Sequence, residues 1–314
     1  MGEAVIDLVE DSDGRFTPHL GGAPANVAIA ASRLGAHAAF AGRLSQSSFG
    51  TRLHRWLAAE GVDLSLAERA PENQTVAVVS LDTTGTATYT FYTDGSADTT
   101  WPADPTVRIM RSEPAAFHFG SLAATVFPAA ETVANVARAA DANGYTVTSF
   151  DLNIRPALAG APGRERSRVE ALLAVAQIVK ASDDDVRYLY PTERADEVAR
   201  RWAESGAAVM LTRGGTGAAV FLPNGTRLAV PARKVTVADT IGAGDAFCGA
   251  LLTRLAELGA LGGGRERLLT LDLTGWREAL WFAVTVASMS CQRFGAEPPR
   301  RATVDLVLSK EEAV

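Results

Sequence analysis

After residue 100, the chain alternates short apolar runs with longer amphipathic stretches. The apolar runs cover residues 117–122, 146–153, 176–182 and 207–215. The amphipathic stretches lie near residues 128–142, 164–175, 194–205, 245–258 and 275–293. A strand that is apolar along its whole length is buried on both faces, and strands that alternate with helices form a parallel sheet. The pattern therefore predicts an α/β fold with a mainly parallel sheet flanked by helices.

The first 100 residues predict a small β appendage. A short strand at residues 4–9 leads into an excursion, and residues 75–92 are typical of a hairpin with a turn at residues 82–85. We expect an antiparallel lid made of residues 9–21 and 63–99, placed so that it covers a site on the core. In this prediction the α/β core consists of residues 1–8, 22–62 and 100–314.

Composition narrows the expected partners and compartment. The 314 residues carry 30 Lys and Arg against 36 Asp and Glu, a formal net charge of −6, which does not favour nucleic acid or an anionic membrane as a partner. Two cysteines are too few for a disulfide framework, which favours a reducing compartment. No apolar run reaches the roughly 18 residues of a membrane-spanning helix. We therefore expect a cytoplasmic protein that binds small molecules.

The most informative segment is a glycine-rich turn directly before a helix. It reads DTIGAGDAF over residues 239–247. Such a turn presents free N–H groups and the positive end of the helix dipole, which together bind an anion. We expect Asp245 beside that anion, where a carboxylate can accept a proton from a hydroxyl group. The alternative is an acid that only caps the first turn of the helix.

A second glycine cluster, TRGGTG at residues 212–217, follows a buried strand at its carboxyl end. Open α/β sheets bind ligands at that edge, although the same residues also suit a tight turn between two strands. Two common nucleotide signatures are missing. There is no GxxxxGKS/T loop, and Phe247 takes the place of the third glycine after Gly242 and Gly244. The sequence therefore favours neither a Walker-type nor a dinucleotide site.

Seven short motifs in a fixed order give the chain a resemblance to a known family. They are GGAPAN at 21–26, LG at 34–35, FG at 49–50, GVD at 61–63, DLNIRP at 151–156, LTRGGTG at 211–217 and DTIGAGDAF at 239–247. Together they resemble the ribokinase-like, or PfkB, carbohydrate kinases from Gly2 to about Pro299. The resemblance implies a Rossmann-like core, a β-sheet lid that often forms a dimer contact, and phosphoryl transfer from ATP to a sugar or nucleoside hydroxyl.

The resemblance also assigns catalytic and sugar-binding roles. Asp245 resembles the catalytic base of the family, and its anion hole is matched by Gly242, Ala243 and Gly244. The residues that resemble those holding the sugar are Asp7, Gly21, Gly22 and Asn26, of which the two glycines also lie at the lid hinge. Arg155 is a further candidate for the sugar or the phosphate, and its alternative is a simple ion pair with an acid.

The expected nucleotide site combines residues from several segments. Its residues are Lys180, Ser182, Thr212, Gly214, Gly215, Gly217 and Gly244. Residues 283–291 resemble one wall of the adenine pocket. A monovalent-cation loop, present in some family members, is matched by Asp239 and by backbone oxygens near Ile241, Ser290, Arg293 and Gly295. The resemblance thus implies ATP, Mg²⁺ and, through this loop, K⁺.

The chain departs from the family where magnesium is organised. The family often has an Asn-x-x-Glu pair, whereas this chain has Ser182 and Asp185. A shorter acid at Asp185 can still order water around Mg²⁺. The same residues are good capping chemistry for a helix start, so a purely structural role stays open.

The lid stretch FYTDGSAD, residues 91–98, resembles that of the fructokinases within the family. Its aromatic residues suit hairpin packing equally well. Fructokinases and ketodeoxygluconate kinases usually carry Arg after the aromatic pair, whereas this chain has Thr93. Because a buried carboxylate needs a paired charge, Thr93 disfavours an acid sugar.

The sequence therefore predicts an ATP-dependent sugar kinase with fructose as the expected substrate. Ketodeoxygluconate kinase and ribokinase are alternatives in the same class. A catalytically silent sugar-binding regulator is the alternative outside it, which the intact Gly-Ala-Gly-Asp motif disfavours. We also expect a homodimer formed through the lid, and we interpret Cys248 as a thiol of the core rather than a nucleophile.

Overall fold

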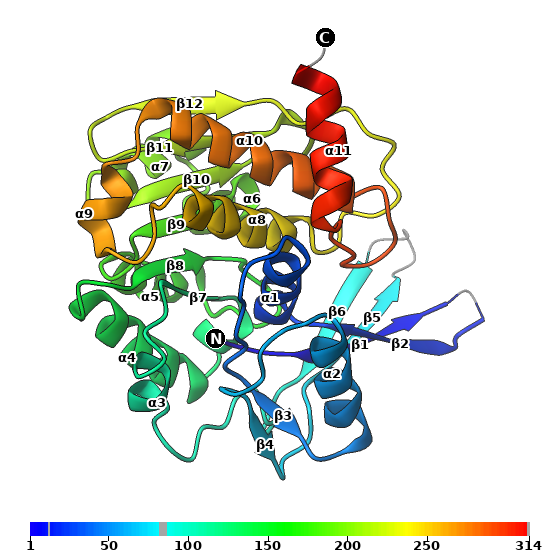
Figure 1. Ribbon diagram of the computed structural model, residues 1–314. Helices are drawn as coiled ribbons and strands as arrows, with labels where there is room; N and C mark the ends of the chain where they lie inside the picture. The colour runs from blue at the N-terminus through cyan, green and yellow to red at the C-terminus, as the bar shows by residue number, and fades with distance from the viewer. Residues whose placement is uncertain (12, 82–86, 313–314) are drawn as a thin grey trace.

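The computed structural model of the chain describes residues 1–11, 13–81 and 87–312. Its larger sheet contains the strands that the apolar runs predict (Figure 1). From one edge to the other these are β12 (Arg227–Val230), β11 (Ala218–Phe221), β10 (Ala208–Thr212), β9 (Ile178–Ser182), β8 (Val147–Asp151) and β7 (Ala116–Gly120). The strands from β7 to β10 are parallel, and β11 and β12 form an antiparallel edge. The predicted mainly parallel sheet is confirmed.

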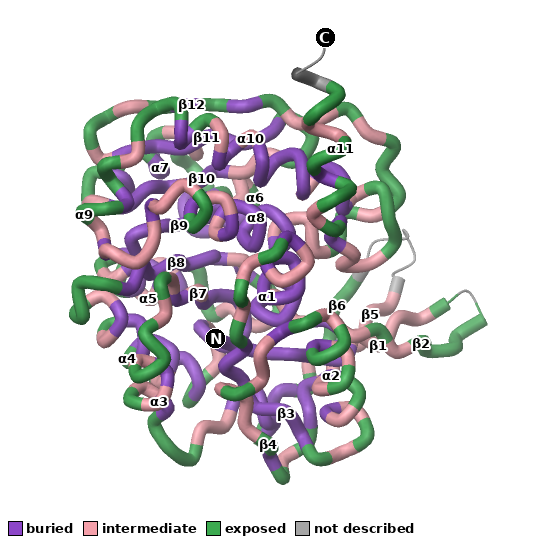
Figure 2. Tube along the Cα trace, in the orientation of Figure 1, coloured by how far each residue is buried: buried purple, intermediate pink, exposed green. Residues whose placement is uncertain are grey.

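Helices cover both faces of this sheet, and the tube in Figure 2 shows the central strands buried between them. One helical layer comprises α3 (Thr106–Met110), α4 (Ala129–Ala142), α5 (Pro162–Leu173), α6 (Asp183–Leu189) and α7 (Ala195–Ala203). The other comprises α1 (Ala23–Arg33), α8 (Ala243–Glu257), α9 (Gly264–Leu269), α10 (Leu273–Ser290) and α11 (Arg301–Glu312). Two single turns of 3-10 helix complete the core, at Leu122–Ala124 and Gly214–Thr216.

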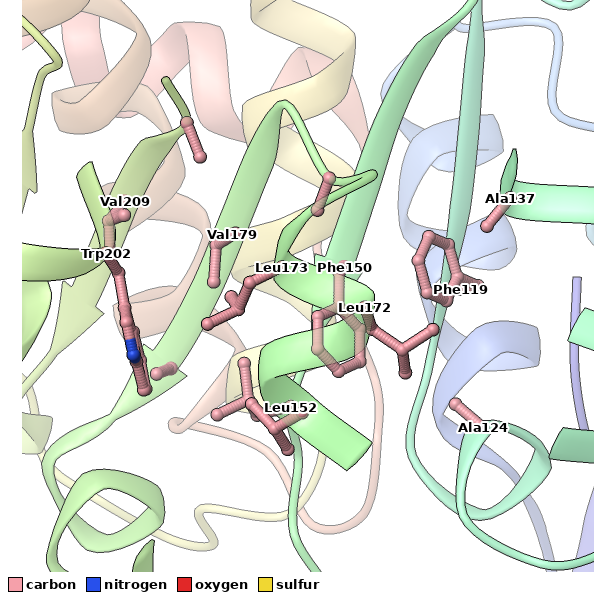
Figure 3. Packing of buried hydrophobic residues seen from close by; sticks show 14 of the residues in the cluster. Phe119, Ala124, Ala137, Phe150, Leu152, Leu172, Leu173, Val179, Trp202 and Val209 are labelled. Carbon is pink, nitrogen blue, oxygen red and sulfur yellow. The ribbon is translucent and has the colours of Figure 1, made fainter. Parts of the chain in front are cut away.

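Aromatic packing fixes which way the strand residues point. The rings of Phe119 and Phe150 stack with their centroids 5.1 Å apart, on the side of the sheet covered by α4 and α5 (Figure 3). Val179 of β9 packs in the same cluster. Because successive residues of a strand face opposite sides, the neighbours Asp151 and Lys180 face the layer that contains α8.

The predicted lid is a four-stranded sheet at the edge of the core (Figure 1). Its strands, in spatial order, are β2 (Phe16–Gly21), β1 (Val5–Glu10), β5 (Val76–Leu81) and β6 (Ala87–Tyr92). The pairing of β5 with β6 confirms the predicted hairpin, whose turn at residues 82–85 lies outside the described residues. The prediction of an antiparallel sheet is wrong for one pair, since β1 and β5 run parallel. These two strands are distant in sequence, so no local turn sets their relative direction.

The proposed division into core and lid remains a prediction, and one strand and one strand pairing cross it. Strand β1 begins within the predicted core segment and continues into the lid segment. Strand β3 (Arg43–Ser45), from the predicted core, pairs with β4 (Glu68–Ala70), from the predicted lid. Helix α2 (Ser48–Ala59) packs beside this small sheet. Within the described ranges, no helix is long and apolar enough to cross a membrane.

Gly22 joins the lid to the core at the start of α1. Its φ of 110° lies in a region that residues with a side chain rarely adopt. A Cβ atom at this position would lie 2.6 Å from the backbone oxygen of Glu3 and 2.8 Å from the Cα of Ala4. The junction therefore depends on direct contact between the backbone at Gly22 and the backbone leading into β1.

We predict that Gly22→Val destabilises the fold by about 2 kcal/mol or more, because backbone strain of about 1–3 kcal/mol is added to a steric clash. Gly35→Val is the matched control, since Gly35 also has a positive φ, of 95°, but a Cβ atom there meets nothing within 4 Å. Chemical denaturation of both variants measures the difference. Equal losses would contradict the role given to the backbone contact.

Candidate active site

The N-terminus of α8 lies at the carboxyl edge of the larger sheet. Gly242 is its N-cap in the left-handed conformation, with a φ of 72°, and a Cβ there would lie 2.5 Å from the Cβ of Ala296. Within the described residues, the backbone N–H groups of Gly244 and Asp245 have no acceptor. Free amides and the dipole of a 15-residue helix make this end of α8 suited to an anion, as predicted from the glycine-rich turn.

Asp245 lies in the first turn of α8 and is only 6% exposed. Its Oδ2 accepts a hydrogen bond of 2.8 Å from Nδ2 of Asn26, a residue 219 positions earlier in the first turn of α1. Burial raises the pKa of the Asp245 carboxyl, while Asn26, Arg155 and Lys180 act in the opposite direction. The carboxylate is thus held in one orientation beside the free amides, where it can accept a proton.

Asp7 of β1 lies close enough to this site for the charges to interact. Burial raises the pKa of Asp7, the charges of Arg155 and His19 lower it, and the charge of Asp245 raises it. A Cβ on Gly21 would lie 2.6 Å from Oδ2 of Asp7, so the carboxylate lies directly against the backbone at Gly21. The structure therefore brings Asp7, Gly21 and Arg155 together with Asp245. His19, which lies opposite Asp7 in the register of β1 and β2, was not selected from the sequence.

The second glycine cluster lies at the carboxyl end of β10, as predicted. Thr212 is the last residue of the strand and lies opposite Ser182 of β9. A Cβ on Gly214 or Gly215 would meet nothing within 4 Å, so these glycines border open space. A Cβ on Gly217 would lie 2.2 Å from the backbone oxygen of Val230, which gives this glycine a structural role in the turn. The tight-turn interpretation thus holds for Gly217, and a ligand-binding role of Gly214 and Gly215 remains a prediction.

Asp185 is tied into the backbone around the start of α6. Its Oδ2 accepts hydrogen bonds from the backbone N–H and the hydroxyl of Ser182, which forms a capping box with it. Its Oδ1 accepts a hydrogen bond of 2.8 Å from the backbone N–H of Ile154. The structure thus shows the capping role that the sequence left open. The role of Asp185 toward magnesium remains a prediction.

The predicted cation loop joins the turn before α8 to the segment after α10. Asp239 accepts hydrogen bonds from the backbone N–H groups of Ile241 (3.0 Å) and Gly295 (2.9 Å). The backbone oxygen of Cys291 accepts hydrogen bonds from residues 238 and 239. The hydroxyl of Ser290 is buried and has no hydrogen-bond partner among the described residues. These hydrogen bonds hold the turn before α8 against the segment after α10, and the role of both segments toward a cation remains a prediction.

Asp151 was not among the predicted site residues, whereas Cys248 is buried in the core as predicted. Asp151 lies within the DLNIRP motif, from which only Arg155 was selected, and its carboxylate binds the ammonium group of Lys180. Cys248 of α8 contacts the same carboxylate. The available signal was an acid at the end of an otherwise apolar strand, which needs a buried partner.

One residue of the lid stretch FYTDGSAD, Asp98, has a structural role. Asp98 is buried and accepts hydrogen bonds from the backbone N–H groups of Ala4 and Thr75 and from the side chain of Gln74. It therefore ties residues before β1 and β5 to the loop after β6. Tyr92, by contrast, is 63% exposed.

A parallel α/β core with a β-sheet lid, and with a buried carboxylate beside free helix amides at the sheet edge, defines a phosphotransferase fold of the ribokinase type. Over residues 1–302 the chain matches the family model described as pfkB family carbohydrate kinase, and it belongs to that family. The resemblance stated from the motifs is confirmed. The fold prediction is confirmed as well, because solved kinases of this type superpose on the whole chain.

Among curated relatives, Fructokinase-1 of Oryza sativa subsp. japonica is 31% identical over 324 aligned positions, covering 100% of this chain and 97% of the relative. Among solved structures, fructokinase from Xylella fastidiosa with bound ATP has a TM-score of 0.89 and 30% identity, covering 100% of this chain and 98% of that one. A double-mutant fructokinase from Vibrio cholerae, with fructose, ADP and a potassium ion bound, has a TM-score of 0.81 and 27% identity, covering 97% and 96% of the two chains.

Proposed function

We propose that this carbohydrate kinase is a fructokinase that transfers the γ-phosphoryl group of ATP to a hydroxyl group of fructose. The observation that carries the proposal is the buried Asp245 carboxylate, oriented by Asn26 beside the free amides of α8. The names and bound ligands of the relatives described above support the substrate pair. The intact base and anion site disfavour a silent regulator on the same scaffold.

The proposed reaction is a direct in-line transfer. The sugar hydroxyl loses its proton to Asp245 as its oxygen bonds to the γ-phosphorus, and the bond from that phosphorus to the bridging oxygen breaks to release ADP. The amides of Gly242, Gly244 and Asp245 hold the oxygens of the transferring group, whereas the N–H group of Ala243 donates to the backbone oxygen of Thr240. No covalent enzyme intermediate forms. Asp7, Asn26 and the backbone at Gly22 orient the sugar in this proposal.

The nucleotide lies along the carboxyl edge of β9 and β10 in this proposal. Gly214 and Gly215 leave open space beside Thr212 for the phosphates, and the last turns of α10 form one wall of the adenine pocket. Lys180 and Ser182 approach the same edge from β9. When bound with ATP, Mg²⁺ neutralises charge on the phosphates. Oδ1 of Asp185 accepts a single hydrogen bond, which leaves it a lone pair for a water around the metal.

A potassium ion fits the loop between Asp239 and Gly295. The buried, unpartnered hydroxyl of Ser290 shows an unused oxygen in this loop, and backbone oxygens of the kind K⁺ prefers lie on the same segments. The oxygens proposed to hold the ion come from Asp239, Ile241, Ser290, Arg293 and Gly295. When bound, the ion stabilises the turn that presents the α8 amides.

A homodimer through the lid and a cytoplasmic location complete the proposal. The lid exposes aromatic side chains at Phe16, Tyr89 and Tyr92, which offer apolar area to a second copy. Both cysteines are free, as expected in a reducing compartment.

We predict that Asp245→Asn keeps the fold and nucleotide binding but lowers kcat by roughly 10² to 10⁴, the usual contribution of a positioned base. Because burial raises the pKa of Asp245, the wild-type activity should fall as the pH drops through that raised pKa. Steady-state ADP release measures both effects. Asp305→Asn, at a half-exposed position on α11, is the matched control. Unchanged turnover in a folded Asp245→Asn protein would exclude the proposed base.

We predict that replacing K⁺ with tetramethylammonium at constant ionic strength lowers kcat, because the loop at Asp239 loses the ion that orders the amide turn. Asp239→Ala should abolish this dependence. Equal rates in the two salts for the wild-type protein would mean that Asp239 is only a turn residue.

We predict that fructose has the highest kcat/KM in a panel with ribose, ketodeoxygluconate and adenosine. Thr93 supplies no cation for an acid sugar, and an unpaired buried carboxylate costs on the order of 2–5 kcal/mol, or about 30-fold and upward in kcat/KM. Arg155→Ala tests whether the core supplies that cation instead. A preference for ketodeoxygluconate that Arg155→Ala removes would overturn the assignment to fructose.

A further inference from the structure

A buried ion pair lies beneath the proposed anion site. Asp151 and Lys180 are partners in the register of β8 and β9, and their side chains are 4% and 7% exposed. Nζ of Lys180 lies 3.0 Å from Oδ1 and 3.1 Å from Oδ2 of Asp151. A buried charge pair in a sheet core is costly to desolvate and is weak evidence for stability alone. Its position therefore calls for a specific role.

The first two turns of α8 cover this pair. A Cβ on Gly244 would lie 3.0 Å from Nζ of Lys180, so only a glycine lets the helix backbone approach the ammonium group this closely without displacing it. One turn later, Sγ of Cys248 lies 3.6 Å from Oδ2 of Asp151. Residues 244 and 248 lie on the same face of the helix. The ammonium group is thus adjacent to Gly244, whose N–H group has no acceptor within the described residues.

We propose that Lys180 is a buried cation of the anion site that stabilises the phosphoryl group during transfer, and that Asp151 is the positioning residue that holds it there. This inference rests on the proposed kinase function and deepens it. An ammonium group has three N–H donors, and the two oxygens of Asp151 engage two of them. A fixed charge near developing negative charge is effective in a site that excludes water.

The electrostatics make the charge of Lys180 depend on Asp151. Burial lowers the pKa of Lys180, but the surrounding acids, with Asp151 first, raise it above its ordinary value. The titratable groups facing it are Asp151 on β8, Cys248 and Asp245 on α8, Asp185 on α6 and His118 on β7. Removing the charge of Asp151 leaves the burial unchanged, so the pKa of Lys180 should fall.

Three variants distinguish a role of the Asp151–Lys180 pair in catalysis from a role in stability. Lys180→Met removes the charge and keeps the length of the side chain, Asp151→Asn leaves the ammonium unpaired, and the double variant removes both charges. We expect Lys180→Met to lower kcat by about 10²-fold, the scale for a lost donor in an anion site, with little change in KM for the sugar. Each single change should lower the unfolding midpoint, because it leaves one buried charge unpaired.

The decisive measurement is the double variant together with a pH profile. We expect the Lys180→Met, Asp151→Asn protein to regain the unfolding midpoint but not kcat. Asp151→Asn alone should lose kcat as the pH rises through the lowered pKa of Lys180, at a pH where the wild type is unaffected. If the double variant regains both stability and kcat, or if the profile of Asp151→Asn matches that of the wild type, the pair is structural only and the inference is wrong.

A control variant and a nucleotide-binding measurement distinguish a failure of this inference from a failure of the proposed function. Arg43→Met removes another buried cation, paired with Glu72 away from α8, and should lower stability without a selective loss of kcat. If the wild-type protein phosphorylates no sugar, the proposed function fails, and calorimetric binding of ATP and ADP tests the inference instead. Lys180→Met should then remove a preference for ATP over ADP. An unchanged preference, or no binding of either nucleotide by the wild type, would overturn it.

Discussion

The site depends on a close crossing between α1 and α8. A Cβ on Gly249 would lie 2.7 Å from the Cβ of Ala30 and 2.8 Å from the backbone oxygen of Val27, so a glycine lets the two helices approach backbone to backbone. One turn before this contact on each helix lie Asn26 and Asp245, joined by their hydrogen bond. A larger residue at the crossing would separate the helices and with them the base from its orienting amide. The packing of α1 against α8 therefore determines the orientation of Asp245 relative to Asn26.

Buried polar contacts fasten the lid to the core, in addition to the apolar cluster that its strands β1, β2 and β5 share with α1 and α2. Asp98 receives hydrogen bonds from the segments that lead into β1 and β5, and the backbone at Gly22 contacts the residues before β1. All these contacts lie at the end of the lid next to α1, where Tyr92 pairs with Val76, whereas the opposite end of the β5–β6 pair, where Leu81 pairs with Ala87, lies away from them. An anchor confined to one end leaves the remainder of the sheet free to respond to a ligand between lid and core.

The predictable features are those set by neighbouring residues. Apolar runs such as 207–215 predicted strands, and the turn at 239–247 predicted the start of α8, because each pattern is complete within one segment. The parallel pairing of β1 with β5 was not predictable, since it depends on where two distant segments meet. The partnership of Asp151 and Lys180 depends in turn on the register of two strands. Sequence reasoning therefore found the residues of each segment and missed the pairs that only the assembled sheet brings together.

The charges around the base favour a neutral ligand from the core side as well as from the lid. Asp151 is neutralised by Lys180, and Asp185 is engaged by three hydrogen bonds from its own neighbourhood. Asp7 and Asp245 remain as interacting carboxylates, opposed mainly by Arg155. The hydroxyl groups of a polyol can donate hydrogen bonds to both carboxylates, whereas an acid sugar would add another negative charge beside them. In the proposed site, this arrangement disfavours a substrate with a carboxylate near the reacting hydroxyl, independently of Thr93, and Arg155 is the cation that could offset it.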